Sequence, residues 1–475
     1  MPSIVPSANA LGVTVMPEWF ACEGVDAVLD RVGALGATSI ATSPYVLEPA
    51  ADGEGGREPP IDAGAGRVRP LDRPLFGRRE LWVRTAPAFV HERSRYAGLV
   101  YQPSPPTALT LRDEPILDRA IERAKARGIE VLLQVMAASP PGYRVQFSGA
   151  RDDDQCLGPD RMPHPDRVDR NASLASPHVV AYVAALVAEL AERYPDVAGF
   201  RLDWPEYPPY DFASALFDFH PAACALMAAQ GHDPDAVARE VRDWRDTVQL
   251  QTVLAAQRGA GAVRDLVQGP EWRALWDDAS PIAPLFAAKR AAVVQLLAAV
   301  RDALDRVPGR RRRLEVQAFP PPFHRISGFP LRDLRGVADA VGIKLYTMHW
   351  PMIARFWAAG LVGAGSGPQV DAAAAALAMS FGFTDGLVDG AALRYPEPDQ
   401  PHPVSAPAQR AKLDEAQREA GSVPVIAFVH SYGPLADVVA RFHAAAGWPR
   451  WINRYGYLSD AKIDALAAAA RERPV

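Results

Sequence analysis

Cysteine and lysine are both scarce in this sequence. The 475 residues include three cysteines, Cys22, Cys156 and Cys224, and no CxxC pair. An odd number of scattered cysteines supports neither a disulfide framework nor a thiolate zinc site. Five of the 51 basic residues are lysine and the others are arginine, a bias typical of GC-rich bacterial coding.

Strong positive charge and long apolar runs are also missing. The formal net charge is −5, whereas nucleic-acid binding relies on clustered Lys and Arg, so we expect no nucleic-acid partner. No charge-free apolar run reaches the ~18 residues of a membrane span, so we expect no membrane association. The N-terminal MPSIVPSANALGVTV lacks the features of a secretory signal, which predicts a cytoplasmic protein.

The signature motifs of several enzyme classes do not occur. There is no HxH or HExxH metal motif, no GxSxG nucleophile elbow and no GxxxxGK[ST] phosphate loop. The glycine-rich segment Gly363–Gly367 lacks GxGxxG spacing, and no strand precedes it. The acidic run Asp152–Asp154 offers calcium ligands, but such runs in loops are more often solvated. We therefore expect no metal and no cofactor.

Short apolar segments rich in β-branched residues alternate with alanine-rich helical segments along the whole chain. This alternation implies a parallel sheet, and eight such units predict an α/β fold of the (β/α)8, or TIM, barrel type. The clearest helices are 114–127, 179–193, 284–307, 434–446 and 461–471. The eight predicted strands are 12–16, 39–43, 130–135, 197–203, 314–319, 340–346, 423–430 and 449–455.

Three long insertions follow predicted strands. Residues 48–112 are rich in Pro, Gly and Arg and carry several aromatics, which suggests a lid. Residues 136–176 follow the third strand, and residues 204–283 have a largely helical pattern. All three lie on the face where barrel enzymes place their active sites, so we expect one elaborated barrel over residues 1–475.

The most informative segment is GFRLDWPEYPPY over 199–210. Side chains alternate across a strand, so Arg201 and Asp203 share one face and Phe200 and Leu202 the other. If the apolar pair meets the helices, the charged pair points into the barrel mouth. A buried charge needs a partner. We therefore predict that Arg201 pairs with Asp203 and keeps it ionised, as a glycosidase nucleophile or base requires.

Glu206 follows in an aromatic and proline-rich setting. Desolvation by such neighbours raises the pKa of a glutamate, which suits a general acid near pH 7. The density of aromatic rings also fits a saccharide cleft, with Trp204 as a substrate contact. The alternative is that Arg201 and Asp203 form a structural ion pair in the barrel core and that Glu206 is a solvated loop residue.

The string GFRLD resembles the strand-four motif of the α-amylase superfamily, in which the Asp is the nucleophile and the Arg two residues earlier positions it. The longer string GFRLDWPEYPPY also resembles bacterial barrel proteins described as hypothetical glycosyl hydrolases. The segment WINRYGYLSDAKIDAL is similar to the last strand and helix of such proteins. The resemblance implies a glycoside hydrolase or transglycosidase with a carbohydrate substrate.

The sequence departs from the amylase pattern in two places. That pattern has an acid Glu after strand five, whereas Glu315 lies early in this strand and is an acid in reserve. It also has His-Asp after strand seven, whereas FVHSY holds His430 without an Asp. The Asn-Glu and Glu pattern of retaining β-glycosidases is absent as well.

Other polar and aromatic residues fall at predicted strand ends, where each is either a substrate contact or a packing residue. Lys344 and Tyr346 share the inward face of strand six, and a strand lysine needs a carboxylate partner or a ligand. The remaining candidates for substrate binding are Glu18, Trp19, Tyr45, His349, Trp350, His430, Asn453 and Tyr455.

These observations predict hydrolysis or transfer of a glycosidic bond, with Asp203 as nucleophile or base and Glu206 as the first-choice acid. A non-catalytic saccharide-binding barrel is the main alternative. A barrel lyase or isomerase that uses Lys344 as a base is a third, which Lys344 facing the helices would exclude. A homo-oligomer is compatible with the sequence.

Overall fold

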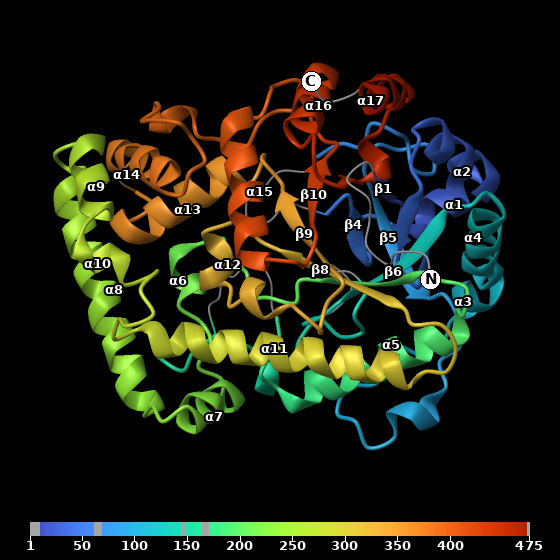
Figure 1. Ribbon diagram of the computed structural model, residues 1–475, viewed down its shortest axis with the longest axis horizontal. Coiled ribbons are helices and arrows are strands. Elements are labelled where there is room, and N and C mark those ends of the chain that lie inside the picture. Colours follow the sequence, from blue (N-terminus) through green and yellow to red (C-terminus); the bar gives the residue numbers. More distant parts are fainter. Residues whose placement is uncertain (1–9, 61–68, 144–148, 164–170, 366, 473–475) are drawn as a thin grey trace.

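A computed structural model describes residues 10–60, 69–143, 149–163, 171–365 and 367–472. Eight parallel strands close into a barrel in the order β1-β11-β10-β9-β8-β7-β6-β2 (Figure 1). Each predicted strand corresponds to one of them, with ends that differ by at most two residues, so the barrel prediction is confirmed. The strands are β1 Leu11–Thr14, β2 Ser39–Thr42, β6 Glu130–Met136, β7 Gly199–Asp203, β8 Arg313–Ala318, β9 Ala340–Leu345, β10 Val425–His430 and β11 Arg450–Asn453.

Helices surround the barrel, and α11 and α5 run side by side along one wall (Figure 1). Local signals fix their starts: the Ser176 hydroxyl accepts hydrogen bonds from the amides of His178 and Val179, and Pro177 takes the first helical position of α5. The helices that pack along the strands are α1 Pro17–Glu23, α2 Val25–Ala34, α3 Ala108–Asp113, α4 Pro115–Ala126, α5 Pro177–Arg193, α11 Ala283–Arg306, α15 Ala406–Ala420, α16 Leu435–Ala444 and α17 Asp460–Arg471.

Helix α11 has the length and apolar composition that could cross a membrane, and 44% of its most apolar window is buried in this structure. Among the described residues it is the one helix of this kind. Its buried leucines, valines and alanines lie in the large core between the strands and the helical wall.

Aromatic side chains fill the inside of the barrel. The rings of Phe428 and Trp451 stack with their centroids 5.9 Å apart. A Cβ at Gly12 would lie 2.2 Å from the Trp451 ring, so the glycine leaves the space that the indole fills. Phe200 and Leu202 lie instead in the outer core beneath the helices, as strand alternation predicts.

The first insertion contains a small antiparallel sheet in the order β3-β5-β4. Its strands are β3 Tyr45–Pro49, β4 Gly56–Glu58 and β5 Leu81–Pro87. The 204–283 insertion is helical, as predicted, and with the helices after β9 it forms a separate helical layer at one side of the barrel (Figure 1). These helices are α6 Phe212–Ala215, α7 Pro221–Ala229, α8 Pro234–Ala256, α9 Ala260–Val267, α10 Pro270–Arg273, α13 Trp350–Val362 and α14 Gly367–Ser380.

The connection from β8 to β9 has no long helix. It contains only the four-residue α12, Phe323–Ile326, and a 3-10 turn at Leu331–Asp333. A (β/α)8 barrel normally places a full helix after each strand. The barrel wall is therefore thinner here, next to α11 and α15.

Candidate active site

Asp203 ends strand β7 at the carboxyl face of the barrel, and 17% of its side chain is exposed. Gln134 on the neighbouring β6 donates its amide Nε2 to Asp203 Oδ2 at 3.3 Å. Trp204 follows with φ of 53°, a left-handed conformation that is rare and strained for a tryptophan, and its indole is part-exposed. A part-exposed acid beside a strained aromatic residue is typical of a functional site.

Lys344 on β9 joins two carboxylates. Its Nζ lies 3.6 Å from Asp203 Oδ1 and 3.0 Å from Glu206 Oε1, and its side chain is 2% exposed. The ammonium also lies over the ring of Phe319, 4.7 Å from the centroid. Lys344 thus faces into the barrel, so the lyase alternative is not excluded on orientation. One buried cation therefore serves two acids, the part-exposed Asp203 and the buried Glu206.

Glu206 has no exposed surface. Besides Lys344, its carboxylate accepts hydrogen bonds from the Phe319 amide and the Ser327 hydroxyl, both at 2.9 Å to Oε2. It therefore fastens the loop after β7 to the loop after β8. The expectation of a solvated loop residue is wrong, and a carboxylate enclosed in this way has no contact with a substrate, which argues against Glu206 as the acid.

Arg201 does not pair with Asp203, which corrects our prediction. Its Nη2 donates to Glu315 Oε2 at 2.6 Å, and its guanidinium lies 3.6 Å from the centroid of the Trp451 ring. Arg313 holds the other oxygen of Glu315 at 3.0 Å. Strand register explains the pairing, because Arg201 and Glu315 are direct neighbours on β7 and β8. Glu315 therefore lies buried below the mouth, which argues against it as a reserve acid.

The electrostatics of the two acids follow from burial. Burial raises the pKa of Asp203, although the nearby charges of Lys344 and Arg201 oppose the rise. Burial also raises the pKa of Glu206, against the effect of Lys344. We expected Arg201 to pair with Asp203 and keep it ionised. Instead it shares one ammonium with a second carboxylate, so its protonated form is favoured relative to an ordinary aspartate.

Further predicted residues meet around Tyr346, which is part-exposed at the end of β9. Asn453 donates its amide to the Tyr346 hydroxyl at 3.0 Å. The rings of His430 and His349 lie edge-on to Tyr346, with centroids at 5.3 and 5.9 Å. Burial, reinforced by Arg69, lowers the pKa of His430 well below its usual value, so this imidazole is neutral at pH 7. The group offers hydroxyl, amide and aromatic contacts beside Asp203.

The predicted residues of strands one and two form a buried pair. The Tyr45 hydroxyl donates to Glu18 Oε2 at 2.9 Å, and Arg454 lies 3.8 Å from the other Glu18 oxygen. Arg454 also pairs with Glu58 of the small sheet. This network ties the first insertion to β11.

Two predicted contacts, Trp19 and Tyr455, are packing residues, which corrects their assignment. Trp19 is 1% exposed and packs edge-on against Tyr455, whose hydroxyl donates to Glu23 at 2.8 Å. Trp350 is also 1% exposed and stacks on Phe383, but it lines the small hollow at the barrel mouth as well.

Sequence reasoning missed residues that distant segments bring to the mouth. Arg69, from the first insertion, places Nη1 3.0 Å from His430 Nε2. The Tyr210 ring packs edge-on against Phe319, and its hydroxyl lies 3.4 Å from His349 Nδ1. No motif marks Arg69, whose partner lies far along the chain. Tyr210 stands in the aromatic segment 199–210, but the sequence did not show that it meets Phe319 and His349.

One residue of the acidic run Asp152–Asp154 has a structural role. Asp154 is buried and accepts hydrogen bonds from the Tyr101 hydroxyl at 2.8 Å and the Ser176 hydroxyl at 3.0 Å. Among the described residues, no three His, Cys, Asp or Glu side chains are arranged to hold a metal ion.

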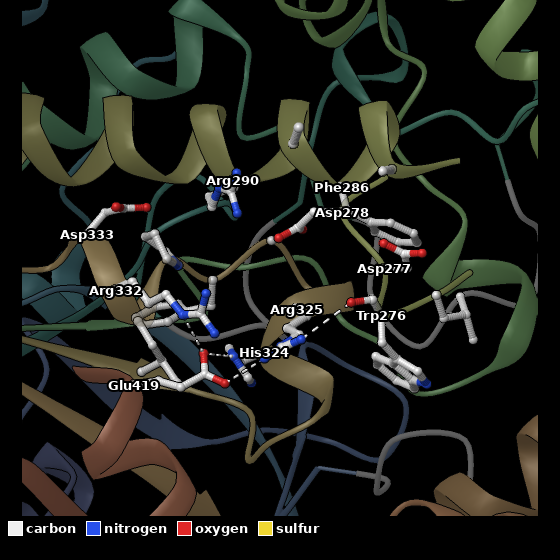
Figure 2. Close-up of a pocket in the computed structure, with 17 residues that line it drawn as sticks. Trp276, Asp277, Asp278, Phe286, Arg290, His324, Arg325, Arg332, Asp333 and Glu419 are labelled. Carbon is white, nitrogen blue, oxygen red and sulfur yellow. Dashed lines mark hydrogen bonds and ion pairs between the residues drawn. The ribbon is translucent and has the colours of Figure 1, made fainter. Parts of the chain in front are cut away.

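A hollow of about 10 Å³ lies at the mouth, and its lining includes Tyr210, Phe319, Lys344, Tyr346, His349 and Trp350. A much larger pocket, of about 230 Å³, lies outside the barrel (Figure 2). The described part of the mouth is thus closely packed around its charged groups.

Comparison with known proteins gives structural similarity only. No family model and no curated protein matches the sequence. The β-galactosidase of Halorubrum lacusprofundi has a TM-score of 0.47 and 13% identity over 97% of this chain and 57% of its own. The β-galactosidase of Rahnella sp. R3 has a TM-score of 0.37 and 13% identity, over 99% of this chain and 58% of its own. The β-galactosidase of Marinomonas ef1 has a TM-score of 0.38 and 13% identity, over 71% of this chain and 41% of its own. The chain therefore spans about two to three fifths of these proteins. By its own closed sheet of eight parallel strands, it is a (β/α)8 barrel.

Proposed function

We propose that this protein hydrolyses or transfers a glycosidic bond, with Asp203 as the carboxyl group that exchanges a proton with the glycosidic oxygen. One observation carries the proposal. Among the described residues, Asp203 is the one part-exposed carboxylate in the last position of a barrel strand, and it shares Lys344 with the buried Glu206. Active sites of this fold lie at these strand ends.

The direction of the Asp203 pKa favours a general acid. A raised pKa retains the proton closer to neutral pH, which is the property that a glycosidase acid needs. In the first step the Asp203 proton passes to the glycosidic oxygen, and the bond between that oxygen and the anomeric carbon breaks with its electrons on oxygen. Water or a sugar hydroxyl then bonds to the anomeric carbon and releases a proton, so the carboxyl group is restored.

Neighbouring residues have supporting roles in this proposal. The Gln134 amide fixes one oxygen of Asp203, which leaves Oδ1 toward Lys344. Trp204 offers a part-exposed ring on which a sugar can stack. Tyr346 and Asn453, already hydrogen-bonded to each other, are placed to bind sugar hydroxyls.

The direct test is turnover of methyl glycosides and disaccharides, whose poor leaving groups need a proton donor, by the wild type and by Asp203→Asn. General acid catalysis contributes ~10²–10⁴-fold, so Asp203→Asn should lose at least that order of activity toward the substrate that the wild type cleaves. Asp153→Asn is the matched control, because Asp153 is 70% exposed in a loop. Normal turnover by Asp203→Asn with an unchanged unfolding curve would remove Asp203 from the mechanism.

A non-catalytic saccharide-binding barrel is the second candidate. It is favoured by the burial of Glu206 and Glu315, which leaves neither able to act as a second carboxylate on a substrate. It predicts saturable binding of a saccharide that Asp203→Asn weakens, without turnover of any glycoside. Hydrolysis by the wild type would exclude it.

A further inference from the structure

The pocket outside the barrel lies between α11, the segment that joins β8 to β9, and α15 (Figure 2). It exists because the β8–β9 connection has no long helix to cover the barrel wall. Its volume of about 230 Å³ is below the ~300–1,000 Å³ of sites for drug-sized ligands. The pocket therefore suits a molecule of about one ring.

A fixed cluster of charges forms one wall of the pocket. Glu419 of α15 accepts from Arg325 at 2.9 Å, contacts His324 Nε2 at 3.0 Å and lies 3.5 Å from Arg332. Figure 2 shows these contacts converging on the Glu419 carboxylate. His324 is 2% exposed, and its Nδ1 has no hydrogen-bond partner among the described residues. The wall thus presents the arginine donors of Arg325 and Arg332, while the unpaired His324 Nδ1 lies buried behind it.

Other polar groups of the pocket carry both signs. Arg290 is exposed on α11 and forms no ion pair with a carboxylate of the described residues, and Arg325 also reaches the backbone oxygen of Trp276 at 3.4 Å. Asp277, Asp278 and Asp333 line the rim. Arginines can only donate and carboxylates can only accept. A small anion would pair with the arginines and be repelled by the carboxylates, and a small cation would do the reverse. Hydroxyl groups both donate and accept hydrogen bonds, so they suit both kinds of side chain.

Two aromatic side chains complete the lining. Figure 2 shows Trp276 and Phe286 on the same side of the pocket, with Arg332 and Glu419 opposite. An aromatic face packs against the apolar C–H face of a sugar ring, while the charged groups bind its hydroxyls.

We propose that this pocket is a second binding site, for one ring of a neutral saccharide. The assignment rests on the juxtaposition of Trp276 and Phe286 with the Arg290, Arg325 and Asp277 side chains around a hollow of one ring. It does not depend on the proposed function, because none of these residues contacts Asp203. The site binds without chemistry, since its most buried carboxylate, Glu419, is fully engaged.

The test uses the full chain in the Asp203→Asn background, so that hydrolysis at the barrel mouth does not interfere. Methyl β-glucoside, methyl β-galactoside and methyl α-mannoside are titrated by saturation-transfer NMR and calorimetry, with glucuronate and glucosamine as charged probes. We expect a neutral glycoside to bind in the ~mM range, and Arg290→Ala to weaken it at least tenfold. Arg290 is exposed, so this variant should fold.

Arg306→Ala is the matched control, since Arg306 is exposed on the same helix outside the pocket and its loss should leave binding unchanged. Trp276→Ala should weaken binding as Arg290→Ala does. Three results would overturn the proposal: no neutral glycoside binds up to ~50 mM, a charged probe binds more tightly than every neutral one, or Arg290→Ala and Arg306→Ala bind equally well.

Discussion

Glu206 at the barrel mouth and Glu419 in the outer pocket are both glutamates in ion pairs, yet their acidities move in opposite directions. Burial raises the pKa of Glu206. Although burial would also raise the pKa of Glu419, hydrogen bonds from His324 and Arg325 lower it to about 2. Glu206 shares Lys344 with Asp203, whereas Glu419 has two arginines and His324 as partners and is 12% exposed.

The difference shows that the ratio of cations to carboxylates decides what a carboxyl group can do. At the mouth, one ammonium serves two acids, the part-exposed Asp203 and the buried Glu206, which favours retention of a proton. In the outer pocket, the carboxylate is held as an anion by an excess of donors. The first arrangement suits acid catalysis and the second suits fixed binding.

The largest effect should come from removing the shared cation. Lys344→Met leaves Asp203 and Glu206 without their shared cation, and breaking a buried ion pair typically costs ~3–5 kcal/mol in the free energy of unfolding. Urea denaturation at pH 7 measures the loss. The double variant Lys344→Met/Glu206→Gln should recover part of it, and Lys125→Met, at an exposed pair with Asp196, should cost less than ~1 kcal/mol. A loss below ~1 kcal/mol for Lys344→Met would mean that the acids do not depend on it.

Glu419→Gln should destabilise the protein by up to ~3 kcal/mol at pH 7, because the pKa of Glu419 falls from 4.5 to about 2 on folding. A depressed pKa gives stability that is present above the unfolded value and is lost as the pH falls toward 2. The gap between wild type and variant, measured by urea unfolding, should therefore close from pH 7 to pH 3. A gap that stays constant over this range would contradict the assignment.

Glu206→Gln should show the opposite pH trend. A raised pKa gives stability that is present below the unfolded value and is lost as the pH rises through the folded value. Relative to the glutamine variant, the wild type should therefore become less stable as the pH rises from 3 toward neutrality. If the stability difference from the wild type changed with pH in the same direction for Glu206→Gln and Glu419→Gln, the opposite pKa shifts of the two glutamates would be wrong.

If Asp203 is the acid, Glu206→Gln should also move the alkaline limb of kcat/KM to lower pH. The variant leaves the charge of Lys344 to Asp203 alone, which lowers the pKa of Asp203, and activity falls as the pH rises through that pKa. Glu122→Gln, on the exposed side of α4, is the control. An alkaline limb that stays in place or moves to higher pH would show that Glu206 does not raise the pKa of Asp203.

The smallest effect is expected for Arg332→Ala. Arg332 is 66% exposed and lies 3.5 Å from Glu419, and pairs of this kind contribute less than ~1 kcal/mol. Thermal unfolding should therefore shift little, whereas a loss above ~2 kcal/mol would show that Arg332 holds Glu419 as strongly as the nearer partners do.

Much of the fold was predictable because strand signals are local. Eight short apolar segments set the barrel, and alternation alone placed Arg201 and Asp203 inside it and Phe200 and Leu202 outside. The site was predictable only in part. The inward positions of Asp203 and Lys344 follow from periodicity, but their contact joins β7 to β9, which only the closed barrel brings together.

By itself, the sequence determined the eight strands, the faces of their side chains and the position of Asp203 at the end of β7, since these depend on residues close along the chain. It predicted Asp203 as the nucleophile or base, and Glu206 as the acid. Only the tertiary structure decided that Arg201 pairs with Glu315 and that Glu206 is buried against Ser327 and Phe319. It also decided that a pocket lies beside α11. These contacts depend on strand register and on which loops meet. Arg201 and Glu315 lie 114 residues apart in the sequence, and Glu206 and Ser327 lie 121 residues apart.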